Sequence, residues 1–248
     1  MTSATDREAE LATALAALTD RLAAAARDAG RDVAGIELLP ITKFFPATDV
    51  AILWRLGCQA FGESREQEAS AKIAEFTDLT GAGDVRWHMV GQIQRNKAKA
   101  IAAWADTIHS LSTAKVAAAL DRGAALAIEN GTRTAPITVF VQISLDGDTS
   151  RGGVDIGNPD AVDELCAQVD EAGGLRLAGL MAVPPLGADP DTAFAALAEE
   201  HRRVMRNHPQ ATALSAGMSG DLEAAVRHGS TCVRVGTALM GQRPLTSP

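Results

Sequence analysis

The sequence contains no tyrosine, and among its 248 residues there are only three cysteines and five lysines. Cys58, Cys166 and Cys232 are far apart and form no Cys-x-x-Cys pair, a pattern typical of buried thiols in a reducing cytoplasm. No segment approaches the roughly 18 consecutive apolar residues of a membrane span. The acidic N-terminal region also lacks the apolar core of a signal peptide. We therefore expect a cytoplasmic protein that does not associate with a membrane.

Basic residues are in the minority, since 31 acidic side chains stand against 23 lysines and arginines and give a net charge of −8. This balance argues against a nucleic-acid-binding protein. A hydrophobic content of 46% and a charged content of 22% exclude the disordered and fibrous classes. The motifs of P-loop, dinucleotide-binding and serine-hydrolase sites are missing. No metal site is predicted either, and His201 and His208 are expected on a solvated helix face.

The chain begins with an amphipathic helical pattern over residues 5–30, whose leucines recur at helical spacing. Asn158-Pro159 and Asp189-Pro190 each pair an N-cap residue with a proline at the first helical position, which predicts two later helix starts. Eight short apolar runs have the character of strands: 36–42, 59–62, 86–90, 107–109, 137–143, 176–181, 213–214 and 231–235.

Eight strands with intervening helices predict an α/β fold of parallel βαβ units, closed into a single (β/α)8 barrel of the TIM type. The segment 5–30 would be an extra N-terminal helix that covers the side a final helix otherwise covers. An open doubly wound sheet is the alternative. No linker divides the chain, so we expect one domain over residues 1–248. In such a barrel the active site lies at the carboxyl ends of the strands.

Lys43 directly follows the first predicted strand and precedes two phenylalanines. Partial desolvation there would lower the pKa of its amine and make it a better nucleophile toward carbonyl groups. The alternative is a lysine that only reaches for solvent at the strand end. The other four lysines fall in helical patterns and are expected to be solvated.

Two segments near the C-terminus predict an anion site. Ser219 lies between a strand and a helix, where it would cap the helix and leave backbone N–H groups facing the barrel mouth; ordinary capping without a ligand is the alternative. The eighth strand ends in Gly236-Thr237, and barrels often bind phosphate after strands seven and eight. Arg234 has apolar neighbours and is expected to point into the barrel toward a partner, because an arginine buried alone is costly.

Three further polar residues each have a functional and a plain interpretation. Ser64 either contacts a ligand or caps a helix, since Ser64-x-x-Gln67 has the spacing of a capping box. His88 either lines the mouth or is a hydrogen-bonded core histidine. Arg151 follows the fifth strand and either meets an anion or belongs to a surface turn.

A nucleophilic lysine and a phosphate site at one barrel mouth suit pyridoxal 5′-phosphate (PLP), whose aldehyde forms a Schiff base with lysine. The sequence resembles the pyridoxal-phosphate homeostasis protein family, which is related to the N-terminal barrel of bacterial alanine racemase. The matching stretches span almost the whole chain in order: Thr42-Lys43-x-x-Pro46, Phe61-Gly62-Glu63, Trp87-His88-x-x-Gly91-x-x-Gln94-x-Asn96-Lys97, His109-Ser110, Gly179-Leu180-Met181, Leu214-Ser215-x-Gly217-Met218-Ser219 and Glu223-Ala224-Ala225-x-x-x-Gly229-Ser230-Thr231-x-Val233-Arg234-x-Gly236-Thr237.

The resemblance implies that Lys43 carries the internal aldimine with PLP. It places Arg234 against the pyridine nitrogen, where a guanidinium would leave that nitrogen unprotonated and make the ring a weaker electron sink. Family members commonly have Asn and an aromatic residue in place of Ser64-Arg65, and some have lysine in place of Arg151. The cofactor-binding residues that we expect are Lys43, Ser64, His88, Met181, Ser215, Met218, Ser219, Arg234, Gly236 and Thr237.

The resemblance therefore implies a protein of vitamin B6 homeostasis that buffers or delivers PLP without significant catalysis. Its partners would be PLP itself and PLP-dependent apo-enzymes, and it would be a monomer. An amino-acid racemase is the alternative. Alanine racemases use the lysine and a tyrosine from a second subunit as two bases, and this sequence has no tyrosine and no stretch left for their second domain. A barrel that has lost its cofactor and serves only as an interaction surface is the third hypothesis.

Overall fold

A computed structural model describes residues 4–242, and all strands in this range belong to one parallel sheet. Eight of them follow the order β1-β9-β8-β7-β5-β4-β3-β2, and a pairing between Ile41 and Gly62 joins β1 to β2 and closes the ring. The predicted barrel is therefore confirmed, and the open doubly wound sheet is wrong. The strands are β1 (Glu37–Pro40), β2 (Ala60–Glu63), β3 (Arg86–Met89), β4 (Thr107–Leu111), β5 (Ile137–Ser144), β6 (Val154–Asp155), β7 (Leu175–Ala182), β8 (Ala213–Ser215) and β9 (Cys232–Val235).

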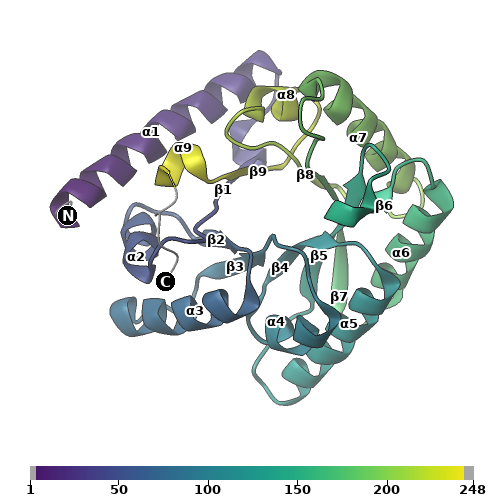
Figure 1. Ribbon diagram of the computed structural model, residues 1–248, viewed down its shortest axis with the longest axis horizontal. Helices are drawn as coiled ribbons and strands as arrows, with labels where there is room; N and C mark the ends of the chain where they lie inside the picture. Colours follow the sequence, from purple (N-terminus) through teal and green to yellow (C-terminus); the bar gives the residue numbers. More distant parts are fainter. Residues whose placement is uncertain (1–3, 243–248) are drawn as a thin grey trace.

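Helices surround the strands as an outer ring (Figure 1). The α-helices are α1 (Ala4–Asp28), α2 (Ala47–Arg55), α3 (Glu66–Thr80), α4 (Ala98–Trp104), α5 (Ala114–Glu129), α6 (Pro159–Glu171), α7 (Pro190–Val204), α8 (Leu222–Arg227) and α9 (Thr237–Met240). Short 3-10 turns occur at η1 (Val33–Gly35), η2 (Arg95–Lys97) and η3 (Thr149–Arg151). None of the helices in the described range is both long enough and apolar enough to cross a membrane.

The N-terminal helix α1 packs against α2, α8 and α9 and completes the ring between the first and last strands (Figure 1). This position confirms the prediction that it covers the side where a final helix is missing. The short α9 and the two-residue β6, which pairs with the end of β5, were not predicted, because two to four residues carry no periodic signal.

The two proline-led helix starts are confirmed. The Asn158 side chain accepts a hydrogen bond from the backbone N–H of Ala161, and that of Asp189 accepts one from Thr192. Each carboxamide or carboxylate oxygen satisfies a backbone donor that the first helical turn leaves without a partner. These caps fix where the outer helices begin after long connections.

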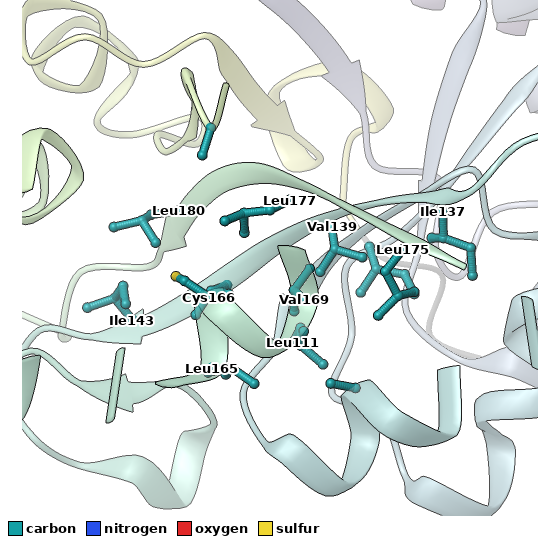
Figure 2. Close-up of a cluster of buried hydrophobic side chains, with 14 of the residues drawn as sticks. Leu111, Ile137, Val139, Ile143, Leu165, Cys166, Val169, Leu175, Leu177 and Leu180 are labelled. Atoms are coloured by element: carbon teal, nitrogen blue, oxygen red, sulfur yellow. The ribbon is translucent and has the colours of Figure 1, made fainter. Parts of the chain in front are cut away.

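The outward face of the strands is apolar and forms the main core with the helices. Along β5, Val139, Val141 and Ile143 belong to this layer and pack with the outward residues of β7 and with α6. Figure 2 shows the side chains of β5, β7 and α6 converging in this layer. Because successive side chains of a strand point to opposite faces, the residues between these positions face the interior of the barrel.

Candidate functional site

The interior of the barrel holds a chain of hydrogen bonds between four buried polar side chains. Arg234 on β9 donates to the Ser215 hydroxyl on β8 and to the carbonyl oxygen of Ala182, the latter at 3.0 Å. Ser215 Oγ lies 2.8 Å from His109 Nδ1, and His109 Nε2 lies 2.9 Å from His88 Nδ1. The prediction that Arg234 points inward toward a partner is confirmed. The chain crosses the interior from β9 through β8 and β4 to β3.

Both histidines of this chain are held in the neutral form. Burial lowers the pKa of His88 to about 3, and burial lowers the pKa of His109 well below its usual value. The His109 ring stacks between His88 and Phe140, with centroid distances of 5.2 and 4.7 Å. His88 Nε2 makes no hydrogen bond within residues 4–242. The chain of hydrogen bonds therefore ends on a buried ring nitrogen that has no hydrogen-bond partner among the described residues.

Lys43 lies just beyond the carboxyl end of β1, at the same end of the barrel as the carboxyl end of β9. Pro40 is in register with Val235, and the backbone N–H of Ile41 donates to the Val235 carbonyl at 2.9 Å. The Lys43 side chain is half-buried, and its Nζ lies 6.0 Å from the centroid of the Phe44 ring. Phe44 itself has a φ of 71°, a left-handed conformation that is uncommon for a bulky residue. The neighbouring β9 ends in Gly236-Thr237, so the lysine and the predicted anion site meet at one mouth.

Ser219 and the first residues of α9 come together although 19 residues separate Ser219 from Ala238. The Ser219 hydroxyl accepts a hydrogen bond from the Ala238 backbone N–H at 3.3 Å. The backbone N–H groups of Ser219, Gly220 and Thr237 have no acceptor within the described part of the chain. Free amides and a hydroxyl at one place are the donors that a phosphate group takes.

The prediction that Ser219 caps a helix is wrong. Helix α8 begins only at Leu222, and Asp221 occupies the N-cap position. The Asp221 carboxylate accepts a hydrogen bond at 2.6 Å from the backbone N–H of Met218. Because residues 218–221 form this turn, α8 begins after Ser219 rather than at it. Ser219 is half-buried and Met218 is exposed at the mouth.

A hollow of about 250 Å³ opens at the mouth between β5 and β7. Met181 lines it together with Gln142 and Val183, and Lys43 is not among its lining residues. Arg151 also lines it, but its guanidinium is paired with Asp146 and Asp148 of its own loop. Of the two interpretations of Arg151, the geometry therefore supports the surface turn.

Ser64 follows the end of β2, two residues after Gly62, and Gly62 pairs with Ile41 just before Lys43. Ser64 lines a different hollow of about 370 Å³ beside α3 and η2, and a Cβ on Gly91 would lie only 2.1 Å from its carbonyl oxygen. The capping interpretation is also wrong, because the N-cap of α3 is Arg65 and no side chain caps that end. After β2 the backbone at Ser64 packs against Gly91. Helix α3 therefore begins one residue later than the Ser64-x-x-Gln67 spacing predicts.

Two expectations about solvated side chains are wrong. His201 and His208 are 6% and 8% exposed, where His201 Nε2 donates to the Ala211 carbonyl and His208 Nδ1 meets the Asp170 carboxylate. Lys72 is 8% exposed and pairs with Glu63. His208 lies beyond the end of α7 at Val204, so it is not on the predicted helix. For His201 and Lys72, the helical pattern does not fix which side of the helix packs against the barrel. Within residues 4–242 no group of His, Cys, Asp and Glu side chains is arranged to hold a metal ion.

Sequence reasoning did not place His109 in the site, although it links His88 to Ser215. The available signal was a histidine inside an otherwise apolar strand at an inward position, which is costly unless it is hydrogen-bonded. Glu63 and Lys72 were missed because they lie on different elements and meet only outside the barrel wall.

Comparison with known proteins gives this arrangement a context. A family model described as the N-terminal domain of alanine racemase matches residues 14–244. A Mycobacterium leprae protein named pyridoxal phosphate homeostasis protein is 61% identical, over 98% of this chain and 96% of its own length. A Corynebacterium glutamicum protein of the same name is 45% identical, over 91% of this chain and 98% of its own length.

The chain belongs to the pyridoxal phosphate homeostasis protein family. The chain is also similar to a solved structure of PipY from Synechococcus elongatus PCC7942, which is described with PLP bound. It is 32% identical with a TM-score of 0.78, and the match covers 93% of this chain and all of PipY. Alanine racemase of Corynebacterium glutamicum has a TM-score of 0.63 at 16% identity, over 93% of this chain and 61% of the racemase. That likeness shows a barrel fold shared with the racemase.

Proposed function

We propose that this protein binds PLP at the barrel mouth and holds it as a Schiff base with Lys43. The observation that carries the proposal is the meeting of three strand ends at one mouth: Lys43 follows β1, the free amides near Ser219 follow β8, and Thr237 follows β9. PLP has an aldehyde for the amine and a phosphate for the amides. The PLP-bound structure described for PipY supports the same ligand.

The residues present fit this cofactor. The amides of Ser219, Gly220 and Thr237 have no acceptor among the described residues, so they are open to phosphate oxygens. At Gly220 a Cβ would meet nothing within 4 Å, so there is space beside these amides. Inside the barrel the Arg234 guanidinium is fixed by Ser215 and the Ala182 carbonyl, which suits a cation that must hold one orientation against a ring nitrogen.

Each part of the site has a separate task in this proposal. Lys43 would supply the amine that condenses with the PLP aldehyde, with loss of water, and hydrolysis would reverse that bond. The group at Ser219 and Thr237 binds the phosphate, and Met218 lies in the same turn. Arg234 orients toward the pyridine nitrogen, and His109 and His88 support Ser215 behind it. A reversible bond together with a separate phosphate grip is what storage and release of a reactive aldehyde require.

The wider role that we propose is buffering of PLP and its delivery to PLP-dependent apo-enzymes, by a monomeric single-domain protein in the cytoplasm. The three cysteines are free thiols, which suits a reducing compartment. The racemase alternative is not favoured, because the sequence has no tyrosine and the buried His88 is committed to His109.

The test is absorbance and mass spectrometry of the purified protein after incubation with PLP and reduction with borohydride. We expect a pyridoxyl group on Lys43 and no absorbance band in a Lys43→Ala variant. Lys115→Ala, which changes an exposed lysine in the first turn of α5, is the matched control and should retain the band. An unchanged spectrum in Lys43→Ala, or an adduct on another lysine, would contradict the proposal.

A further inference from the structure

A buried ion pair lies on the outer face of the barrel wall, directly behind Lys43. The Lys72 ammonium on α3 is 2.6 Å from Glu63 Oε1 at the end of β2, and the two side chains are 9% and 0% exposed. Among the ion pairs between residues 4 and 242, it is the one in which both partners are buried. Its neighbours on this face of the strands, Phe61 and Trp87, belong to the apolar core.

The pair is attached to the residue that precedes Lys43. Lys72 Nζ donates to the Thr42 carbonyl oxygen at 2.9 Å, and the Thr42 hydroxyl donates to Glu63 Oε1 at 2.6 Å. The Thr42 carbonyl also accepts from the backbone N–H of Phe45 at 3.0 Å, and the Thr42 N–H donates to the Gly62 carbonyl at 3.0 Å. Every polar group of Thr42 is therefore held, so the peptide bond that leads into Lys43 has one orientation.

Stability alone is a poor explanation for this arrangement. A buried ion pair is often no more stabilising than apolar residues of the same volume, because both charges lose their hydration. Burial raises the pKa of Glu63, and its Oε2 has no hydrogen-bond partner within the described residues. An apolar wall would avoid these costs at this position, as it does elsewhere on the outer face.

The backbone on the other side of Lys43 is strained. Phe44 adopts a φ of 71°, and such conformations persist only where the surrounding structure over-determines them. Two cations lie over the Phe44 ring, Lys43 Nζ at 6.0 Å and Arg65 Cζ at 5.6 Å from its centroid. The Thr42 anchor supplies the fixed end against which this turn is held.

We propose that Lys72 is a positioning residue for Lys43. Through Glu63 and the Thr42 carbonyl, it fixes the turn that presents the Lys43 amine to an aldehyde at the barrel mouth. This inference rests on the proposed function, because it concerns how fast the Schiff base forms. A buried cation on the outside of the barrel thus controls a reaction at the mouth without contacting the cofactor.

The decisive variant is the double substitution Glu63→Gln with Lys72→Met. Lys72→Met alone would leave an uncompensated buried carboxylate and risks unfolding, whereas the double variant removes both charges and keeps an acceptor for the Thr42 hydroxyl. Lys97→Met is the matched control, because it removes a lysine from a more exposed pair with Glu66 at 3.2 Å. The rate of Schiff-base formation is followed by absorbance after mixing with PLP. Pyridoxine 5′-phosphate, which has no aldehyde, measures binding without the covalent bond.

We expect Schiff-base formation in the double variant to be about 10- to 100-fold slower than in the wild type, since small displacements of a reacting group cost this much. The affinity for pyridoxine 5′-phosphate should be unchanged, and Lys97→Met should behave as the wild type. An equal rate in the double variant would overturn the inference. So would a parallel loss of pyridoxine 5′-phosphate binding, which would show a structural role. A wild-type protein that forms no adduct on Lys43 would instead refute the proposed function itself.

Discussion

Along β5, Val139, Val141 and Ile143 point outward into the helices, whereas Phe140 and Gln142 on the same strand point inward, toward His109 and the mouth hollow. The same division holds on β9, where Val233 and Val235 face the helices and Arg234 faces the interior. The outer layer is mainly a packed apolar core, whereas the inner layer combines the hydrogen-bonded chain of polar groups with two small apolar clusters. The difference shows that the outward face of these strands holds the fold together, while the inward face carries the side chains of the candidate site.

This comparison predicts that substitutions on the two faces separate stability from ligand binding.

An outward substitution should be the most destabilising. Leu180 is fully buried in the outer layer, so Leu180→Ala should lower the free energy of unfolding by about 2–5 kcal/mol, through lost burial and the cavity that remains. Urea unfolding followed by circular dichroism measures the loss. PLP binding at a temperature where the variant is folded should be unchanged, and a loss of binding comparable to the loss of stability would break the comparison.

A substitution at the mouth should show the reverse. Ser219→Ala with Thr237→Ala removes two hydroxyls beside the free amides, and hydrogen bonds to a charged group contribute about 1.5–3 kcal/mol each. We expect the double variant to bind PLP at least about tenfold more weakly, while its binding of phosphate-free pyridoxal is unchanged. Titration of both ligands measures the difference. If the two ligands lost affinity equally, the phosphate would not bind at Ser219 and Thr237.

The inner histidines should make stability depend on pH. Burial lowers the pKa of His88 to about 3, and an unfolded histidine titrates near 6.5. Between these two pH values the unfolded chain binds a proton that the folded chain excludes, so stability is full above about pH 6.5 and falls as the pH falls toward 3. His88→Gln should reduce the slope of the free energy of unfolding in this range by up to about 1.4 kcal/mol per pH unit.

The control for this prediction is His228→Gln, which changes a half-buried histidine at the outer surface beside Asp191. Urea unfolding at a series of pH values compares the three proteins. A His88→Gln slope identical to that of the wild type would mean that the inner chain accepts a proton in the folded state, contrary to the division between the faces.

The smallest expected effect concerns turnover. With no tyrosine in the sequence and His88 buried against His109, conversion of L-alanine to D-alanine by the PLP-loaded protein should stay at the level of free PLP. Chiral chromatography measures both enantiomers. Rapid racemisation would show that the interior supplies a second base after all.

Part of the site could be predicted from the sequence, and Arg234 and Lys43 show why. Arg234 stands between two valines in a short strand, and the alternation of side chains places it inside without further information. Lys43 directly follows a strand, and a barrel brings such positions to one mouth. The two predicted serine caps were wrong for local reasons. Before α8, the Asp221 side chain accepts the hydrogen bond of the turn. At Ser64, the backbone packs closely against Gly91. Such contacts between neighbouring segments have no periodic signature.

The order of apolar runs and helical patterns determined the fold and the faces of the strands, because both depend on spacing along the chain. The family was indicated by the matching motifs, among them Thr42-Lys43-x-x-Pro46. Tertiary structure decided which distant residues meet. Ring closure joined His88 and His109 to Ser215 and Arg234, and the packing of α3 buried Lys72 against Glu63 behind Lys43. The periodicity of a sequence indicates which face of a strand a side chain occupies. Its partner across the barrel depends on how all the strands close into a ring, and this closure is fixed only when the whole core packs.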